Sequence, residues 1–135
     1  MKGNIEYGEL EAARKLFPNL TIKPMGRKTF VSKSSPDPVD VRQAQKGFSL
    51  AKKAVQNKEF DVVILDEINM AIDYGLIPLD DLLQLIDSKP ETVELILTGR
   101  NAKPEVMDKA DLVTEMIDRK HYHDRGISAR KGIEI

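Results

Sequence analysis

The sequence has no cysteine and no tryptophan, and aromatic residues make up only 5% of its 135 residues. The absence of cysteine excludes disulfides and thiolate metal sites, and it fits a reducing compartment such as the cytoplasm. No stretch approaches the roughly 20 apolar residues of a membrane-spanning helix, and the first residues contain no apolar signal core. We therefore expect a soluble, cytoplasmic protein without a membrane partner.

An excess of charge of either sign is also missing. The chain has 21 basic and 22 acidic residues, which gives a formal net charge of −1. This balance provides no electrostatic reason to expect nucleic acid as a partner. Hydrophobic residues account for 41% of the chain, and its length suits one domain with a real core. We predict a single domain over residues 1–135.

A further absence concerns nucleotide binding. No stretch matches G-x-x-x-x-G-K-[ST], the glycine-rich loop whose amides hold phosphate. Residues 60–67 nevertheless read as a buried strand, apolar throughout 62–65, that ends in Asp66 and Glu67. Acids at the carboxyl end of such a strand can hold Mg²⁺ together with phosphate oxygens. The alternative is that both acids are surface charges where the strand meets solvent.

Apolar periodicity predicts alternating helices and strands. The strand at 62–65 does not alternate, which predicts that both of its faces are covered. The expected elements are a helix over 7–17, a strand at 20–23, a loop at 26–37, a helix over 39–57, the strand at 62–65, a connection at 68–77, a helix over 79–87 with Leu79, Leu82, Leu83 and Ile86 inward, a strand at 93–97, a helix over 104–109 and a strand at 112–117. Such βαβ alternation predicts a parallel sheet with right-handed crossovers.

Ligands of open parallel sheets bind at the carboxyl ends of the strands. Asp66 and Glu67 follow one predicted strand, and residues 98–101 follow the next. Arg100, after Thr-Gly, can pair with phosphate in a fork geometry, or it can form a salt bridge with a carboxylate such as Glu67. The glycine before it indicates either a close backbone approach or a positive φ, or an ordinary turn.

Two other segments leave alternatives open. Phe30, beside Val31 in a polar loop, is either a tether onto the core or a wedge that faces a ligand. The basic segment 119–131 could clamp an anion, but a charge run is more often a solvated segment. His121 and His123 lack an evident third metal ligand, which favours the same interpretation.

Five segments together carry a family resemblance. They are residues 60–69, 74–79, 94–102, 110–116 and 120–134. In combination they resemble the ATP:corrinoid adenosyltransferases (cob(I)alamin adenosyltransferases) of the P-loop type, over nearly everything from residue 60 onward. The resemblance implies a P-loop NTPase (RecA-like) α/β fold, a parallel sheet flanked by helices, that is N-terminally truncated. In the family, the first strand and the P-loop precede the position of Met1, so an in-frame phosphate loop upstream would distinguish a fragment from a degenerate member.

The resemblance implies a function and a set of site residues. The reaction is transfer of the 5′-deoxyadenosyl group of ATP to cob(I)alamin or another corrinoid, with release of triphosphate, in cobalamin biosynthesis or salvage. Mg²⁺ would be bound by Asp66 and Glu67, and Glu67 and Arg100 would act in catalysis. Phe30 would pack on the corrin, and Phe30 and Asn101 would be the cofactor-binding residues.

The resemblance also bears on partners and on activity. It implies a homodimer and a reductant protein that supplies Co(I). The family often has tryptophan two residues after the loop aromatic, where this chain has Ser32. Without a P-loop, we expect activity to be impaired. The alternatives are a non-catalytic corrinoid-binding or protein-interaction module that has lost ATP binding, and an unrelated ATPase fragment.

Overall fold

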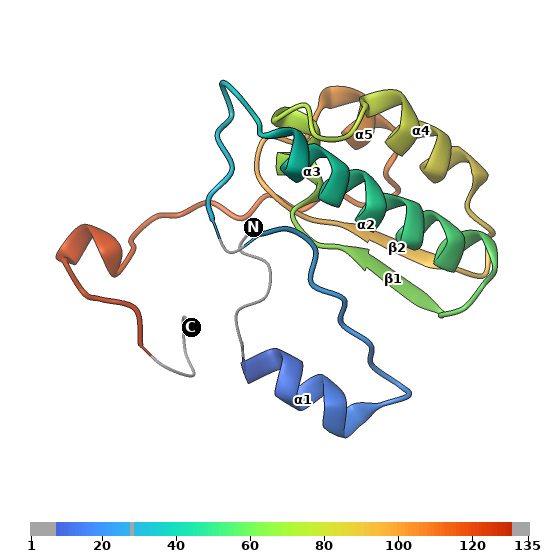
Figure 1. Ribbon diagram of the computed structural model, residues 1–135, viewed down its shortest axis with the longest axis horizontal. Coiled ribbons are helices and arrows are strands. Elements are labelled where there is room, and N and C mark those ends of the chain that lie inside the picture. The colour runs from blue at the N-terminus through green and yellow to red at the C-terminus, as the bar shows by residue number, and fades with distance from the viewer. Residues whose placement is uncertain (1–7, 28, 131–135) are drawn as a thin grey trace. The chain divides into compact units, whose positions relative to one another are not determined.

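The computed structural model describes residues 8–27 and 29–130, in which irregular segments connect the helices and two short strands (Figure 1). They fall into two units, one formed by residues 25–111 and the other by residues 8–24 and 112–130, apart from residue 28. This division does not test the single-domain prediction, which stays a prediction.

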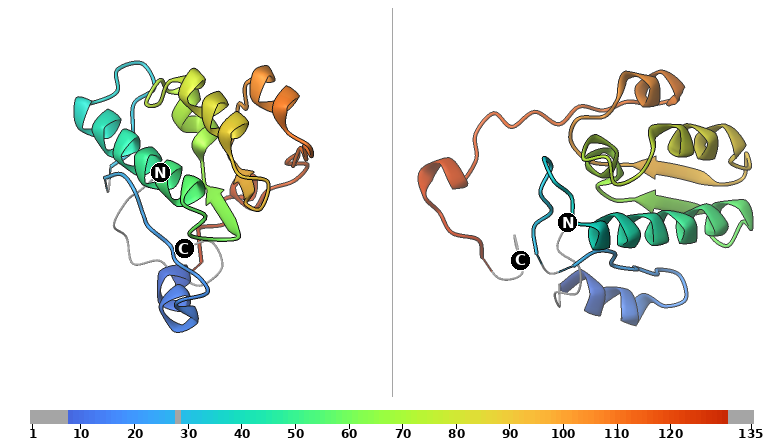
Figure 2. Two further views of the ribbon diagram at one scale, coloured as in Figure 1. Left: turned by 90° about the vertical axis from the view of Figure 1, so that its right-hand side faces the viewer. Right: turned by 45° about the horizontal axis from the view of Figure 1, so that its top comes forward.

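The first unit is an α/β arrangement. Strands β1 (Val62–Leu65) and β2 (Glu94–Leu97) pair in parallel, with Val62 opposite Glu94 and Leu65 opposite Leu97. Parallel neighbours require a crossover connection, and here it contains α3 (Ile68–Asp73) and α4 (Leu79–Ser88). Helix α2 (Pro38–Gln56) precedes β1 and runs along it, and α5 (Pro104–Lys109) packs against α4 (Figure 2). The predicted α/β fold with helices flanking a parallel sheet is confirmed.

Local sequence explains the longest helix. The side chain of Asp37 caps α2 by accepting a hydrogen bond from the Val39 amide at 2.8 Å, and Pro38 occupies the first turn. Phe48 and Val55 then fall on the buried stripe of this helix. The predicted helix over 39–57 is therefore confirmed, with a sharply defined start.

The core of the first unit lies between the helices and one face of the sheet. Its largest fully buried side chains are Val55, Leu82, Leu85 and Val93. The prediction for α4 is right for Leu82, but the second fully buried position is Leu85, which we did not predict. Leu79, Leu83 and Ile86 are partly buried against this core. The buried stripe of α4 is therefore centred on Leu82 and Leu85, which lie three residues apart.

The prediction that both faces of β1 are covered is wrong. Val63 packs against the core, whereas Val62 and Ile64 are 48% and 58% exposed, and Ile96 on β2 is 45% exposed. Side chains alternate between the faces of a strand, and the described structure covers only one of them. An apolar run indicates that a strand suits two covering layers, but it does not supply the second layer.

The predicted strand at 112–117 is wrong as well. The structure has an extended segment there, with Leu112 and Met116 84% and 93% exposed. The strand predicted at 20–23 is also absent. Neither segment pairs with a strand among residues 8–27 and 29–130, and an unpaired strand leaves its backbone groups to solvent.

Other elements of the prediction are confirmed or corrected in detail. Residues 68–77 hold the helix α3 and are not merely a connection, and α5 is confirmed. In the second unit, α1 (Gly8–Leu16) confirms the first predicted helix, although Tyr7 lies outside the described residues. A 3-10 turn, η1 (His123–Arg125), interrupts the basic segment 119–131. Residue 131 of this segment lies outside the described residues. None of the described helices is long and apolar enough to cross a membrane.

Candidate functional site

The carboxyl ends of β1 and β2 meet through one threonine. The Thr98 hydroxyl accepts a hydrogen bond from the Glu67 amide at 2.9 Å and donates one to Asp66 Oδ1 at 2.8 Å. The Asn69 amide donates in turn to the Thr98 carbonyl at 3.1 Å. The structure therefore brings together the two strand ends that the sequence singled out, and it assigns Thr98 a bridging contact that sequence reasoning missed.

The turn after β1 has an unusual backbone conformation. Glu67 precedes α3 with φ 61° and ψ 22°, in the left-handed region that non-glycine residues adopt at a cost of about 1–3 kcal/mol. Opposite it, Gly99 has φ 116°, and a Cβ atom there would lie 3.2 Å from Glu67 Cα and 3.3 Å from Glu67 Oε2. Both the positive φ and the close approach predicted for this glycine are confirmed. The two turns pack so closely that a side chain at position 99 would displace the acid.

The two carboxylates differ in environment. Asp66 is exposed, whereas Glu67 Oε2 is buried and has no hydrogen-bond partner among the described residues. A buried carboxylate oxygen without a partner is costly, and a cation would compensate it. Mg²⁺ suits one or two carboxylates with water and phosphate oxygens completing its shell. The pair fits that ion, although no cluster of three or more His, Cys, Asp or Glu side chains exists in the described part of the chain.

The side chains of Arg100 and Asn101 lie in different surroundings. Arg100 is exposed and makes no ion pair within the described residues, so the salt bridge to Glu67 that the sequence allowed is not formed. Asn101 has φ 60° and donates a hydrogen bond from Nδ2 to Asp73 Oδ2 at 2.9 Å. The guanidinium is therefore available to a ligand, while the amide nitrogen of Asn101 is engaged.

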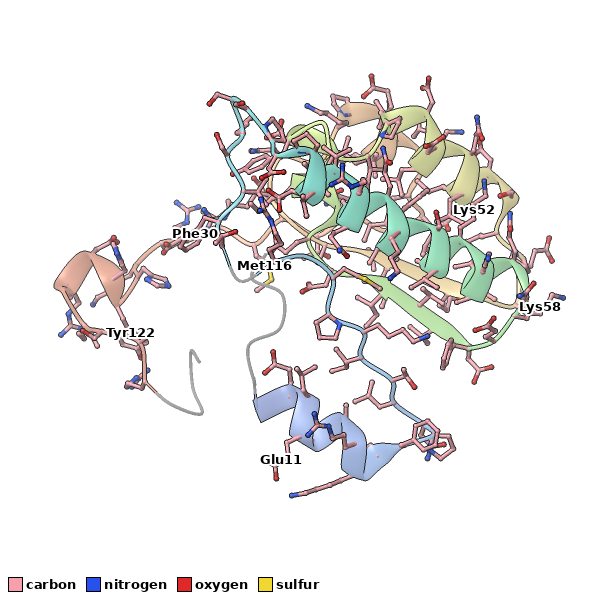
Figure 3. The ribbon with its side chains drawn as sticks, viewed as in Figure 1. Glu11, Phe30, Lys52, Lys58, Met116 and Tyr122 are labelled. Atoms are coloured by element: carbon pink, nitrogen blue, oxygen red, sulfur yellow. The ribbon has the colours of Figure 1, made fainter. Side chains whose placement is uncertain are left out.

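Phe30 and Val31 separate the two interpretations of the apolar pair. Val31 packs against the core, while Phe30 is 80% exposed on the loop before α2 (Figure 3). Phe30 lines a pocket of about 90 Å³ whose wall includes Glu67, Met70 and Tyr74. Val31 is thus the tether, and Phe30 lies at the surface beside a largely apolar pocket.

Sequence reasoning missed a cluster of charges around Asp73. The carboxylate accepts hydrogen bonds from Lys33 Nζ at 2.6 Å, Asn101 Nδ2 at 2.9 Å and Lys103 Nζ at 3.1 Å. Lys33, then Asn101 and Lys103, lower the pKa of Asp73 from 3.8 to about 2. No local pattern reveals this cluster, because its donors lie 28 to 40 residues from Asp73.

A second ion pair, between Arg27 and Asp40, lies at the start of the loop that carries Phe30. Arg27 Nε and Nη2 donate to the two carboxylate oxygens of Asp40 at 2.8 and 2.7 Å, and Nη2 also lies 3.1 Å from Asp37 Oδ2. The hydrogen bonds from Arg27 hold the pKa of the buried Asp40 below its usual value. Such a two-pronged guanidinium–carboxylate contact is geometrically specific. It ties residue 27 to the first turn of α2.

The described residues of the basic segment hold no group of three or more His, Cys, Asp or Glu side chains. In the second unit, the His121 ring nitrogen Nδ1 accepts a hydrogen bond from the His123 amide at 3.0 Å, and the side chains are exposed. The Arg130 guanidinium lies 4.9 Å from the centre of the Tyr122 ring. These contacts match the interpretation of a solvated segment.

Comparison with known proteins places the whole chain in one group. The family model for ATP:corrinoid adenosyltransferase BtuR/CobO/CobP matches residues 1–135. A corrinoid adenosyltransferase of Sinorhizobium sp is 34% identical over 136 residues, which cover 100% of this chain and 64% of the relative. A corrinoid adenosyltransferase of Pseudomonas aeruginosa is 32% identical over 135 residues, which cover 100% of this chain and 66% of the relative. An uncharacterized protein of Nostoc sp. is 30% identical over 140 residues, which cover 100% of this chain and 37% of the relative. The chain thus spans less than two thirds of the length of each of these relatives.

Proposed function

Because this chain belongs to the family of ATP:corrinoid adenosyltransferases, we propose that it takes part in transfer of the 5′-deoxyadenosyl group of ATP to a corrinoid, in cobalamin biosynthesis or salvage. The electron pair of Co(I) forms a bond to C5′ of ATP. The C5′–O bond breaks, and its electrons leave with the triphosphate. The reaction needs a cobalt held near C5′ and positive charge on the leaving group.

The observation that carries this proposal is the joined pair of strand ends. Thr98 holds Asp66 and the Glu67 backbone, and the buried Glu67 Oε2 lacks a partner among the described residues. Asp66 and Glu67 would hold Mg²⁺, which when bound neutralises charge on the triphosphate. The exposed guanidinium of Arg100 would contact a phosphate from the same edge of the sheet.

The corrinoid contacts would come from the neighbouring loops. The exposed ring of Phe30 offers an apolar surface to the corrin, which would displace the lower axial base and favour four-coordinate cobalt. The side-chain oxygen of Asn101 makes no hydrogen bond within the described residues and could accept one from a corrin carboxamide. A separate reductant would supply the electron for Co(I), and we propose that the working protein is a homodimer in the cytoplasm.

A non-catalytic corrinoid-binding module is the second candidate. These 135 residues contain no G-x-x-x-x-G-K-[ST] stretch, so by themselves they lack the loop amides and the lysine that hold phosphate. We propose that these 135 residues by themselves bind MgATP weakly. Calorimetric titration with MgATP should therefore show no binding at micromolar concentrations, and a micromolar Kd would contradict the proposal.

Corrinoid binding tests the part that both candidates share. Titration with cob(II)alamin, followed by its visible absorbance, should show saturable binding and a shift towards the four-coordinate spectrum. Phe30→Ala should remove the spectral shift, whereas Phe17→Ala alters an exposed aromatic of the second unit and serves as the matched control. Absence of any corrinoid binding, with and without MgATP, would overturn the proposed function.

A further inference from the structure

The contacts around Asp73 connect three parts of the first unit that are distant in sequence. Lys33 belongs to the loop of residues 29–37, which carries Phe30 and is called here the Phe30 loop. Asn101 and Lys103 belong to residues 98–103, the strand-end loop, which carries Arg100. Asp73, the last residue of α3, accepts a hydrogen bond from each of these three side chains.

We propose that Asp73 is a positioning residue that holds the Phe30 loop and the strand-end loop in one fixed arrangement. We use the name Asp73 latch for the four side chains of Asp73, Lys33, Asn101 and Lys103. The consequence for corrinoid binding rests on the proposed function, because it requires Phe30 and the strand-end loop to face the same ligand.

The location of Asp73 indicates that the role of its charge is to make these contacts. The C-terminal turn of a helix disfavours an acid, because the helix dipole places negative charge at that end. The Asp73 side chain is also only 9% exposed, so water compensates little of its charge. Three donors from two loops replace that solvent, and residues that violate a local rule in this way often serve a site.

Phe30 lies between two anchors. Arg27, three residues before it, is held by Asp40, and Lys33, three residues after it, is held by Asp73. Three residues span at most about 10–11 Å, so fixing both ends restricts where Phe30 can go. Lys33 Nζ also lies 5.7 Å from the ring centre of Tyr74, a residue that lines the same pocket as Phe30.

The two lysine contacts differ in their exposure. The Lys33 side chain is 56% exposed, and that of Lys103 is 38% exposed. Solvent and salt screen the more exposed pair more strongly. The Phe30 loop is therefore the side of the latch that releases first when salt rises, while the strand-end loop keeps its amide and lysine contacts.

The absence of tryptophan from the chain provides a direct test of loop position. Ser32→Trp would place a single fluorophore on the exposed Phe30 loop, next to Lys33 and without altering Phe30. Time-resolved anisotropy then reports its local motion. In the Ser32→Trp background, Asp73→Asn and Lys33→Met should each increase the amplitude of the nanosecond local component about twofold.

Matched variants separate the latch from a general loss of charge. Lys46→Met removes a lysine from the exposed face of α2 that has no ion pair in the described structure, and it should leave the anisotropy unchanged. The double variant Asp73→Asn/Lys33→Met should be no more mobile than the more mobile single variant, because both changes break the same contact. Unchanged anisotropy in both single variants, with far-UV circular dichroism intact, would overturn the inference.

A measurement of corrinoid binding distinguishes this inference from the proposed function. In the chain with its natural Ser32, Asp73→Asn should weaken cob(II)alamin binding about tenfold and reduce the four-coordinate spectral signal, because the loop must be ordered on binding. Asp73→Glu, which keeps the charge, should restore part of both. If the unaltered chain binds no corrinoid, the proposed function fails, and the anisotropy alone still decides whether Asp73 positions the loop.

Discussion

Thr98→Val tests the link between the two strand ends at atomic detail. Valine keeps the branched shape of threonine but removes the hydroxyl that accepts from the Glu67 amide and donates to Asp66. The partly buried amide then lacks its partner, at a cost of about 1–3 kcal/mol. Asp66 is exposed, so water replaces the second hydrogen bond with little loss. We expect Thr98→Val to lower the free energy of unfolding by about 1–2 kcal/mol.

Thr98→Ser is the matched control, since it keeps the hydroxyl and removes only a methyl group. A fully buried methylene contributes about 0.8 kcal/mol, and Thr98 is only partly buried, so the serine variant should lose less than that. Urea unfolding followed by circular dichroism would show the difference as a midpoint roughly 0.5–1.5 M lower for valine than for the unaltered chain. A valine variant as stable as the serine variant would refute the bridging role of the hydroxyl.

Three further predictions follow from the same structure. Carbon-detected NMR should find a pKa of about 2 for Asp73 and a higher pKa in Lys33→Met. Because the pKa is lowered, the charged form stabilises the fold above about pH 4, and this stabilisation is lost as the pH falls towards 2. A pKa of 3.8 for Asp73 would contradict the three contacts. Leu82→Ala, at a position with no exposed surface, should cost about 2–5 kcal/mol in urea unfolding, and a loss below about 1 kcal/mol would contradict its burial. On β1, Ile64→Thr on the exposed face should change stability by at most about 0.5 kcal/mol, whereas Val63→Thr, which faces the core, should cost about 1–3 kcal/mol; the opposite order would show that the faces are misassigned.

The positions of helices and strands could be predicted wherever neighbouring residues carry the signal. Asp37 and Pro38 define the start of α2, and the periodic apolar residues define its buried stripe. The strands β1 and β2 and the short helix α5 follow from apolar runs and proline in the same way. These signals are local, so they are present in the sequence whatever the rest of the chain does.

Strand pairing could not be predicted from the same signals. Residues 112–117 have the composition of a strand, yet the structure leaves them extended and exposed. A strand forms only when another backbone satisfies its amides and carbonyls, and that partner is remote in sequence. The exposed face of β1 has the same origin, because an apolar residue on a strand is buried only if another layer lies over it.

The sequence by itself determined the family, through motifs that cover the chain from residue 60, and it placed Asp66, Glu67 and Arg100 after two strands. Only the tertiary structure decided how these ends are joined: the Thr98 bridge, the left-handed turn at Glu67 and the contacts of Asp73. The physical reason is distance along the chain. Motifs and propensities depend on adjacent residues. The hydrogen bonds of Thr98 and Asp73 instead join residues 28 to 40 positions apart, and they exist only once the sheet has formed.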